Sequence, residues 1–137
     1  MNNKGNWAMD EFGGAQVGDA RLTKRLIKLA DRLADAPSAS IPGACNGHAE
    51  TQGAYRLFDQ ARADKRALSW EAVLAPHMAR TAARMAEHPV VLCLQDTTEL
   101  DFNGQAIEGL GKLSYEAQRG MYLHPTYAVS PQRLPLG

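Results

Sequence analysis

Apolar residues recur at helical spacing in the first part of the chain. Four leucines separated by four, three and four positions form one stripe: Leu22, Leu26, Leu29 and Leu33. This period places them on one face of a helix. Asp19 stands where an N-cap is expected, and the helix should end before Pro37. The sequence therefore predicts a helix over residues 19–34.

Two further helices are predicted from similar patterns. Residues 48–58 can turn Ala54, Leu57 and Phe58 toward a core. Residues 69–85 begin at a serine cap, contain a proline that can kink the helix, and have an inner face made of Val73 or Leu74, Met78, Ala82 and Met85. Residues 38–47 between the first two helices are rich in turn formers and predict a connector with little regular structure.

The periodicity changes near residue 90. Residues 90–94 form an apolar run too short for a helix and predict a buried strand, in which Cys93 is a small core residue. A second strand is expected over residues 121–129, and a third over 134–137 that is too short to pair with it. The glycine-rich residues 101–120 predict a mobile loop. Helices followed by strands give the predicted fold class, α+β.

Composition and charge narrow the classes of protein. The 137 residues are 45% apolar, which suffices for the core of one ordinary domain, or of one small domain and part of another. The net charge of zero argues against a generic polyanion binder. Because there is no apolar run of about 18 residues and no secretion signal, we expect a cytoplasmic protein that contacts no membrane. Cys45 and Cys93 lack the CxxC spacing typical of zinc sites.

Basic residues form a ridge on the other side of the first helix. Five of them stand at spacings of three or four, opposed within the helix by Asp31: Arg21, Lys24, Arg25, Lys28 and Arg32. Such a ridge can straddle DNA phosphates, and each contact then adds a salt-dependent increment to affinity. A solvated helix face is the alternative that spacing alone leaves open.

Polar residues around the start of the second helix are of types that hydrogen-bond to base edges as well as to phosphates: Asn46, His48, Gln52 and Arg56. A helix that opens on small residues can also come close to a phosphate. Taken singly, a histidine in the place of His48 is more often an ordinary surface or capping residue than a recognition residue.

An aspartate follows the first predicted strand. Asp96 comes directly after the apolar run, where a rigid strand would fix the position of a carboxylate that suits Mg²⁺. Glu99 and Asp101 lie close in sequence and could hold one stray cation, but a two-metal site needs carboxylates from separate elements. A turn or capping role for Asp96 is the ordinary alternative.

Several short motifs follow one another in a fixed order. They are Gly18-Asp19-x-Arg21, Arg25-Leu26, Ser40-Ile41-Pro42, Ala44-Cys45-x-Gly47, Gly53-Ala54-Tyr55-Arg56, Gln95-Asp96-Thr97-Thr98-x-Leu100, Gly109-Leu110-Gly111, and Arg119-Gly120 with His124. In this order they resemble the N-terminal part of the bacterial cut-and-paste transposases of the transposon-five type, in the insertion-sequence-four group. The resemblance covers residues 7–137, and ordered agreement across many blocks is more specific than any single block.

The resemblance implies two domains. Residues 1–68 would be a helical domain that binds double-stranded DNA at the terminal inverted repeats, and residues 69–137 a connecting helix and the truncated start of an RNase-H-like catalytic domain. Together with the lysines of the ridge, the implied DNA-binding residues are Arg21, Lys24, Arg25, Lys28, His48, Gln52, Tyr55 and Arg56. One departure is Leu22, where the family has an arginine beside Arg21.

In the same resemblance Asp96 is the first aspartate of a catalytic Asp-Asp-Glu triad and a ligand of Mg²⁺ or Mn²⁺. The second aspartate, the glutamate and the family's dimerisation region have no counterpart here, so we expect an N-terminal transposase fragment that retains DNA binding and does not catalyse alone or hold metal productively. Two alternatives remain: a small metal-dependent nuclease centred on Asp96, Glu99 and Asp101, or a non-functional relic with an exposed strand edge.

Overall fold

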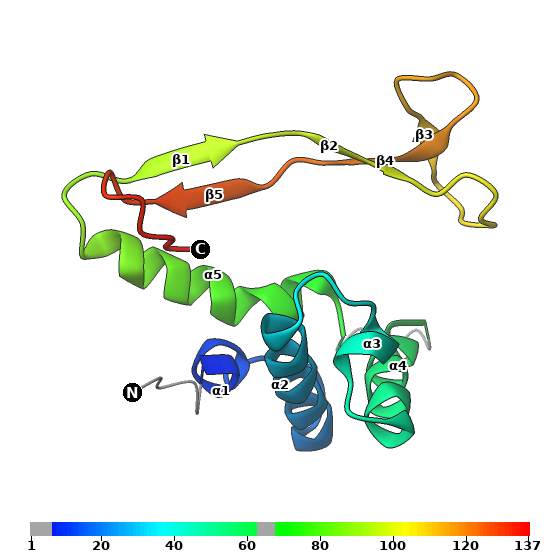
Figure 1. Cartoon of the computed structure of the whole chain (residues 1–137), viewed down its shortest axis with the longest axis horizontal. Coiled ribbons are helices and arrows are strands. Elements are labelled where there is room, and N and C mark those ends of the chain that lie inside the picture. The colour runs from blue at the N-terminus through cyan, green and yellow to red at the C-terminus, as the bar shows by residue number, and fades with distance from the viewer. Residues whose placement is uncertain (1–6, 63–67) are drawn as a thin grey trace. The chain divides into compact units, whose positions relative to one another are not determined.

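A computed structural model describes residues 7–62 and 68–137 of the chain. The chain forms two compact units, Met1–Ala83 and Arg84–Gly137. The first unit is helical and the second consists of small antiparallel sheets, so the predicted α+β class is confirmed (Figure 1). The division falls within a helix, whereas the domain boundary expected between residues 68 and 69 stays a prediction.

The predicted helices form close to their expected bounds. Helix α2 spans Ala20–Asp35, α4 spans His48–Arg62 and α5 spans Trp70–Ala86. Asp19 caps α2 as predicted, since its Oδ1 accepts hydrogen bonds from the backbone N–H of Arg21 at 2.7 Å and of Leu22 at 3.0 Å. These bonds lower the pKa of Asp19 below its ordinary value, with the Leu22 bond as the largest cause.

Two short helices were not expected. Helix α1 spans Trp7–Phe12, and α3 spans Ile41–Ala44 inside the stretch predicted to be irregular. That prediction was wrong because Ser40 supplies an N-cap whose Oγ accepts a hydrogen bond from Gly43 N at 3.3 Å. Pro42 then fits the first turn, where no backbone donor is needed.

The core of the helical unit lies between α2 and α4. Its buried residues come from these helices and the segments that flank them: Ala15, Val17, Leu26, Leu29, Ala54, Leu57 and Leu68. Leu22 and Leu33 pack against this cluster, which confirms the predicted leucine stripe. Glu50 near the start of α4 bonds to Arg32 toward the end of α2, and the earlier Arg25 shares a pocket with the later Arg56, so the two helices run antiparallel, side by side in Figure 1.

Two predicted core faces need correction. Leu57 is 1% exposed, but the adjacent Phe58 is 47% exposed, because a step of about 100° along a helix turns it off the buried face. On α5, Val73 packs against the core, whereas Met78 is 59% exposed and no described residue of the helix is fully buried. The expected inner face of α5 is therefore reduced to its first turns.

In the second unit, strand β1 (Leu92–Gln95) pairs antiparallel with β5 (Thr126–Val129). A separate sheet has the order β2-β4-β3, formed by Thr98–Asp101, Arg119–Leu123 and Gly111–Lys112. Between the sheets, residues 96–97 and 124–125 lie opposite one another and carry no ladder pairing. Pro125 cannot donate a backbone hydrogen bond, which explains why the predicted strand over 121–129 divides into β4 and β5.

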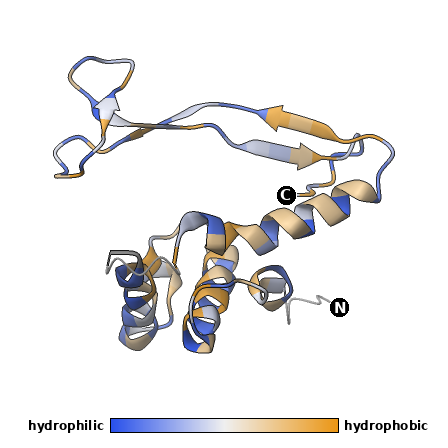
Figure 2. Ribbon diagram, turned by 180° about the vertical axis from the view of Figure 1, so that it is seen from behind, coloured by the Kyte–Doolittle hydropathy of each residue, from blue (hydrophilic) through white to orange (hydrophobic). Residues whose placement is uncertain are grey.

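The expectation of a buried first strand was wrong. All four residues of β1 are exposed, including Cys93, although the strand is apolar, as its hydrophobic colour in Figure 2 shows. A two-stranded sheet leaves faces uncovered unless another layer packs on them. Burial instead falls on Ala128 and Val129 of β5.

The C-terminal residues and the glycine-rich stretch also differ from expectation. Leu136 N donates to Ala128 O at 2.9 Å and Ala128 N to Gly137 O at 2.7 Å, so β5 does gain a backbone partner from residues 134–137. Residues 101–120 contain the short strand β3 and the buried Leu113, although most of the segment is exposed. A Cβ at Gly120 would collide with the carbonyl oxygen of Leu100, so the β2–β4 pairing requires glycine there.

Candidate nucleic-acid interface

The basic ridge of α2 divides between two sides of the helix. Lys24 lines a hollow that Met9 and Gly13 border beside α1, whereas Arg25, Lys28 and Arg32 line a pocket shared with α4. Arg21 is largely exposed near the start of the helix, with its Nη2 3.7 Å from Asp19 Oδ2. An exposed ion pair of that length contributes little, so Arg21 stays available to solvent or a ligand.

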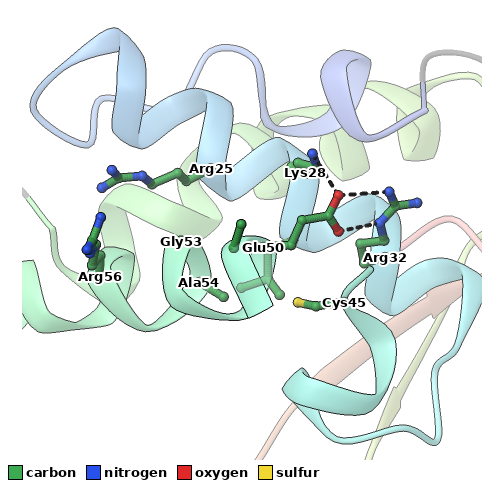
Figure 3. Close-up of a pocket in the computed structure, with 10 residues that line it drawn as sticks. Arg25, Lys28, Arg32, Cys45, Glu50, Gly53, Ala54 and Arg56 are labelled. Atoms are coloured by element: carbon green, nitrogen blue, oxygen red, sulfur yellow. Dashed lines mark hydrogen bonds and ion pairs between the residues drawn. The ribbon is translucent and has the colours of Figure 1, made fainter. Parts of the chain in front are cut away.

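The pocket between α2 and α4 has a volume of about 280 Å³ (Figure 3). Its floor is made of small or apolar side chains, among them Leu29, Cys45 and Ala54. Four basic residues and one acidic residue line it: Arg25, Lys28, Arg32, Arg56 and Glu50. The structure thus brings Arg25 and Lys28 together with Arg56, a predicted DNA-binding residue from the other helix.

Glu50 is a residue that the sequence reasoning missed. Its Oε1 lies 2.7 Å from Lys28 Nζ and 3.0 Å from Arg32 Nη2, and its Oε2 lies 2.8 Å from Arg32 Nε. The backbone N–H of Asn46 also donates to Oε2 at 2.8 Å. These donors, Arg32 first, hold the pKa of Glu50 far below its ordinary value, and Glu50 in turn raises the pKa of Arg32.

A signal for Glu50 was present in the sequence but needed the fold. Glu50 is the third residue of α4, and Lys28 and Arg32 stand one turn apart on α2. The three meet because the helices are antiparallel, a relationship that helical periodicity does not reveal. A bidentate arginine–carboxylate pair of this kind fixes geometry as well as charge.

The outer face of α4 carries the remaining predicted contacts. His48, Gln52 and Tyr55 follow one another at spacings of four and three and are all exposed. Asp59 stands one turn beyond Tyr55 on the same face. These side chains do not line the α2–α4 pocket, so α4 presents two surfaces: Arg56 toward the pocket, and a polar face without lysine or arginine toward solvent.

Asp96 lies in the interruption between β1 and β2 and is exposed. Its Oδ1 accepts a hydrogen bond from Thr97 N at 2.8 Å, and Thr97 Oγ1 lies 2.6 Å from His124 Nδ1. Thr97 and His124 belong to two different sequence motifs, 27 positions apart, and they meet between the β1–β5 sheet and the β2-β4-β3 sheet. The bond to Thr97 joins two adjacent residues, and both the metal-ligand role and the turn or capping role of Asp96 stay predictions.

The carboxylates near Asp96 in sequence serve other partners. Glu99 accepts hydrogen bonds from Ser114, from its N–H at 3.0 Å and from its hydroxyl, and this lowers the pKa of Glu99. Asp101 accepts from Asn103 N at 2.8 Å and Gln118 Nε2 at 2.9 Å. Within residues 7–62 and 68–137, no group of three acidic, histidine or cysteine side chains could hold a metal ion. The metal cluster that the small-nuclease hypothesis requires does not form among these residues.

Helices α1–α4 form a small helical unit with a cationic pocket and an exposed polar helix face. Residues 4–63 match the family described as transposase DNA-binding, and this segment contains helices α1 to α4 in full. The segment is therefore a transposase DNA-binding domain, and the resemblance inferred from the ordered motifs is confirmed for this part. Among the described residues, no helix combines the length and apolar character needed to cross a bilayer.

Proposed function

We propose that the helical unit binds the terminal inverted repeats of a transposon as the end-recognition domain of a cut-and-paste transposase. The match of residues 4–63 to the transposase DNA-binding family carries this proposal. The geometry supports it, because basic side chains from two helices converge on one pocket while α4 keeps a separate polar face exposed. DNA recognition commonly divides in this way between phosphate and base contacts.

The two faces suit different parts of the duplex. Arg25 and Arg56 are suited to phosphate oxygens, because a guanidinium offers several donors and keeps its charge. His48 and Gln52 on the outer face of α4 have side chains that can donate to or accept from base edges. Arg21 and Lys24 extend the positive surface along α2. In this arrangement α2 positions the domain and α4 reads sequence.

Asp96 belongs to a second part of the proposal. We infer from the ordered motifs that it is the first carboxylate of an Asp-Asp-Glu triad in an RNase-H-like domain. Bound Mg²⁺ or Mn²⁺ would there activate the attacking oxygen and stabilise the leaving one during phosphodiester hydrolysis and strand transfer. The described residues do not supply three ligands, so they do not by themselves fit a two-metal centre. Catalysis then requires carboxylates contributed by other parts of a complete transposase.

Fluorescence anisotropy tests the DNA-binding proposal. The protein is titrated into a labelled duplex carrying the inverted repeat that flanks its coding sequence, and into a scrambled duplex of equal length, at salt concentrations from about 50 to about 200 mM. We expect tighter binding to the repeat and a linear fall of log K with log salt. Equal binding to both duplexes, with an affinity that salt does not change, would show that the helical unit is not an end-binding domain.

A further inference from the structure

The pocket between α2 and α4 has two unlike ends. At one end the Glu50 carboxylate forms an ion pair with Lys28 Nζ at 2.7 Å. It also accepts hydrogen bonds from two nitrogens of Arg32 at 2.8 and 3.0 Å and from Asn46 N at 2.8 Å. Both carboxylate oxygens are thus engaged twice. The charges of Lys28 and Arg32 are already partly compensated inside the protein, and the Arg32 side chain is 30% exposed against 57% for Lys28.

At the other end no acidic side chain lines the pocket, although Arg25 interacts electrostatically with the Asp19 carboxylate. Arg25 from α2 and Arg56 from α4 lie near one another in Figure 3, away from Glu50. Neither guanidinium has an ion-pair partner among the residues that the structure describes. Two arginines on facing helices can hold a phosphodiester between them, since each offers parallel N–H donors to its oxygens.

We propose that Glu50 is a positioning residue that confines backbone phosphate contact to the Arg25–Arg56 end of this pocket. The inference rests on the proposed DNA-binding function and adds where on the domain a phosphate is held. A phosphate brought to Lys28 meets the Glu50 carboxylate at the same time, and like charges at such distances repel. At Arg25 and Arg56 it meets two cations and no nearby acid that lines the pocket.

The proposal changes the meaning of the basic ridge. Five basic residues in sequence suggest five equivalent phosphate contacts, whereas Glu50 removes Arg32 from that set and weakens Lys28. Within the pocket the effective positive charge then lies at the Arg25–Arg56 end, and Arg21 and Lys24 still continue it along α2. This fixes the register of the domain on the duplex, because phosphates can be bound tightly at one end of the pocket and not at the other.

A salt-dependence series tests this through the coupling of Lys28 and Glu50. A substitution that abolishes binding to one phosphate should reduce the slope of log K against log salt by about 0.9. We expect that reduction for Arg25→Gln and for Arg56→Gln, and less than half of it for Lys28→Gln. In Glu50→Gln the slope should steepen, and adding Lys28→Gln should then remove about 0.9. Lys112→Gln, in the other unit, is the charge-matched control.

If Glu50 only holds α2 and α4 together, the salt-dependence series gives a different result. Glu50→Gln would then lower the stability of the protein, and adding Lys28→Gln would change the slope of log K against log salt no more than it does in the unchanged chain. The proposal would be overturned if Lys28→Gln alone reduced the salt slope as much as Arg25→Gln alone does. That comparison needs no change at Glu50, so it decides the matter even if Glu50→Gln does not fold.

Inorganic phosphate gives a readout that does not depend on end-sequence binding. Glu50→Gln leaves Lys28 and Arg32 without the carboxylate that bonds to both, so phosphate should raise its unfolding midpoint more than that of the unchanged protein. Glu50→Asp, which keeps the charge, should respond like the unchanged protein. An equal response of all three would contradict the role of Glu50. If the unchanged chain shows no salt-dependent DNA binding, the proposed function fails, and the phosphate series still decides whether Glu50 excludes anions.

Discussion

His77 Nδ1 lies 2.6 Å from Oε1 of the buried Glu11, which joins α5 to α1 within the helical unit. The imidazole also stacks on Phe12, with ring centroids 6.1 Å apart. Glu11 has a further interaction in the structure, so His77 is one of its partners. A buried carboxylate that loses a hydrogen-bond partner is costly, and the short α1 therefore depends on a residue 66 positions away.

Removing that imidazole should destabilise the helical unit. For His77→Ala we expect a decrease of about 1–3 kcal/mol in the free energy of unfolding, because the Glu11 carboxylate stays buried with one partner fewer. Urea unfolding followed by tryptophan fluorescence measures this, since both Trp7 and Trp70 belong to the helical unit. His48→Ala, at an exposed histidine, should change stability by less than about 0.5 kcal/mol. Equal effects of the two changes would contradict the role of the His77–Glu11 pair.

Neighbouring apolar residues of α4 should respond very differently to truncation. Leu57 is fully buried, so Leu57→Ala should cost about 2–5 kcal/mol of unfolding free energy through reduced burial and a residual cavity. Phe58→Ala removes a larger side chain that is half exposed, and we expect a clearly smaller decrease. Urea denaturation of the two variants makes the comparison. A larger decrease for Phe58→Ala would mean that α4 packs with a different face.

Acid should weaken the link between α2 and α4 in a defined pH range. The pKa of Glu50 is lowered in the folded state from an ordinary value of 4.5, so its stabilising contribution is fully present above that value. The contribution is lost progressively as the pH falls below 4.5 toward the folded-state pKa. Unfolding midpoints of the unchanged protein and of Glu50→Gln, measured from neutral pH downward, should therefore differ at neutral pH and converge in acid. A difference that stays constant over this range contradicts the assignment.

The two cysteines should differ in reactivity. Cys93 is exposed on β1 and Cys45 is half-buried in the α2–α4 pocket, and neither forms a disulfide. A neutral maleimide should modify Cys93 faster, by about an order of magnitude, because its side chain is the more accessible of the two. Mass spectrometry of peptides after short labelling times identifies the modified residue. In Cys93→Ser only the slow labelling of Cys45 should remain. Preferential labelling of Cys45 would indicate that β1 is covered in solution.

Much of the helical unit could be predicted from local pattern. The leucine stripe, the Asp19 cap and the Ser69 cap are properties of adjacent residues, and the structure confirms them; Ser69 Oγ accepts from Ala72 N at 3.1 Å. The short α1 and α3 were missed because their helical character depends on a few capping and packing contacts. Glu50 was missed because its partners lie on another helix.

The sheet unit was harder to predict, for a physical reason. An apolar run such as residues 90–94 signals burial only if a second layer covers it, and periodicity cannot report that layer. The division of the second strand followed from Pro125, which was visible in the sequence. The pairing that sets His124 against Thr97 required the antiparallel register. Site predictions on α2 and α4 remain to be tested by DNA binding, and that of Asp96 by reconstitution with a complete catalytic domain.

The interruption between the two sheets of the second unit has a mechanical consequence. Two residues on each strand, 96–97 and 124–125, lie outside the ladders and separate the pairing of β1 and β5 from that of β2 and β4. Hydrogen bonds that hold a ladder straight are missing at this point, so each short sheet can take its own right-handed twist. A carboxylate at such an interruption can be re-aimed by a small change in twist, without any ladder bond being broken. Asp96 stands between the two sheets, not within a rigid strand.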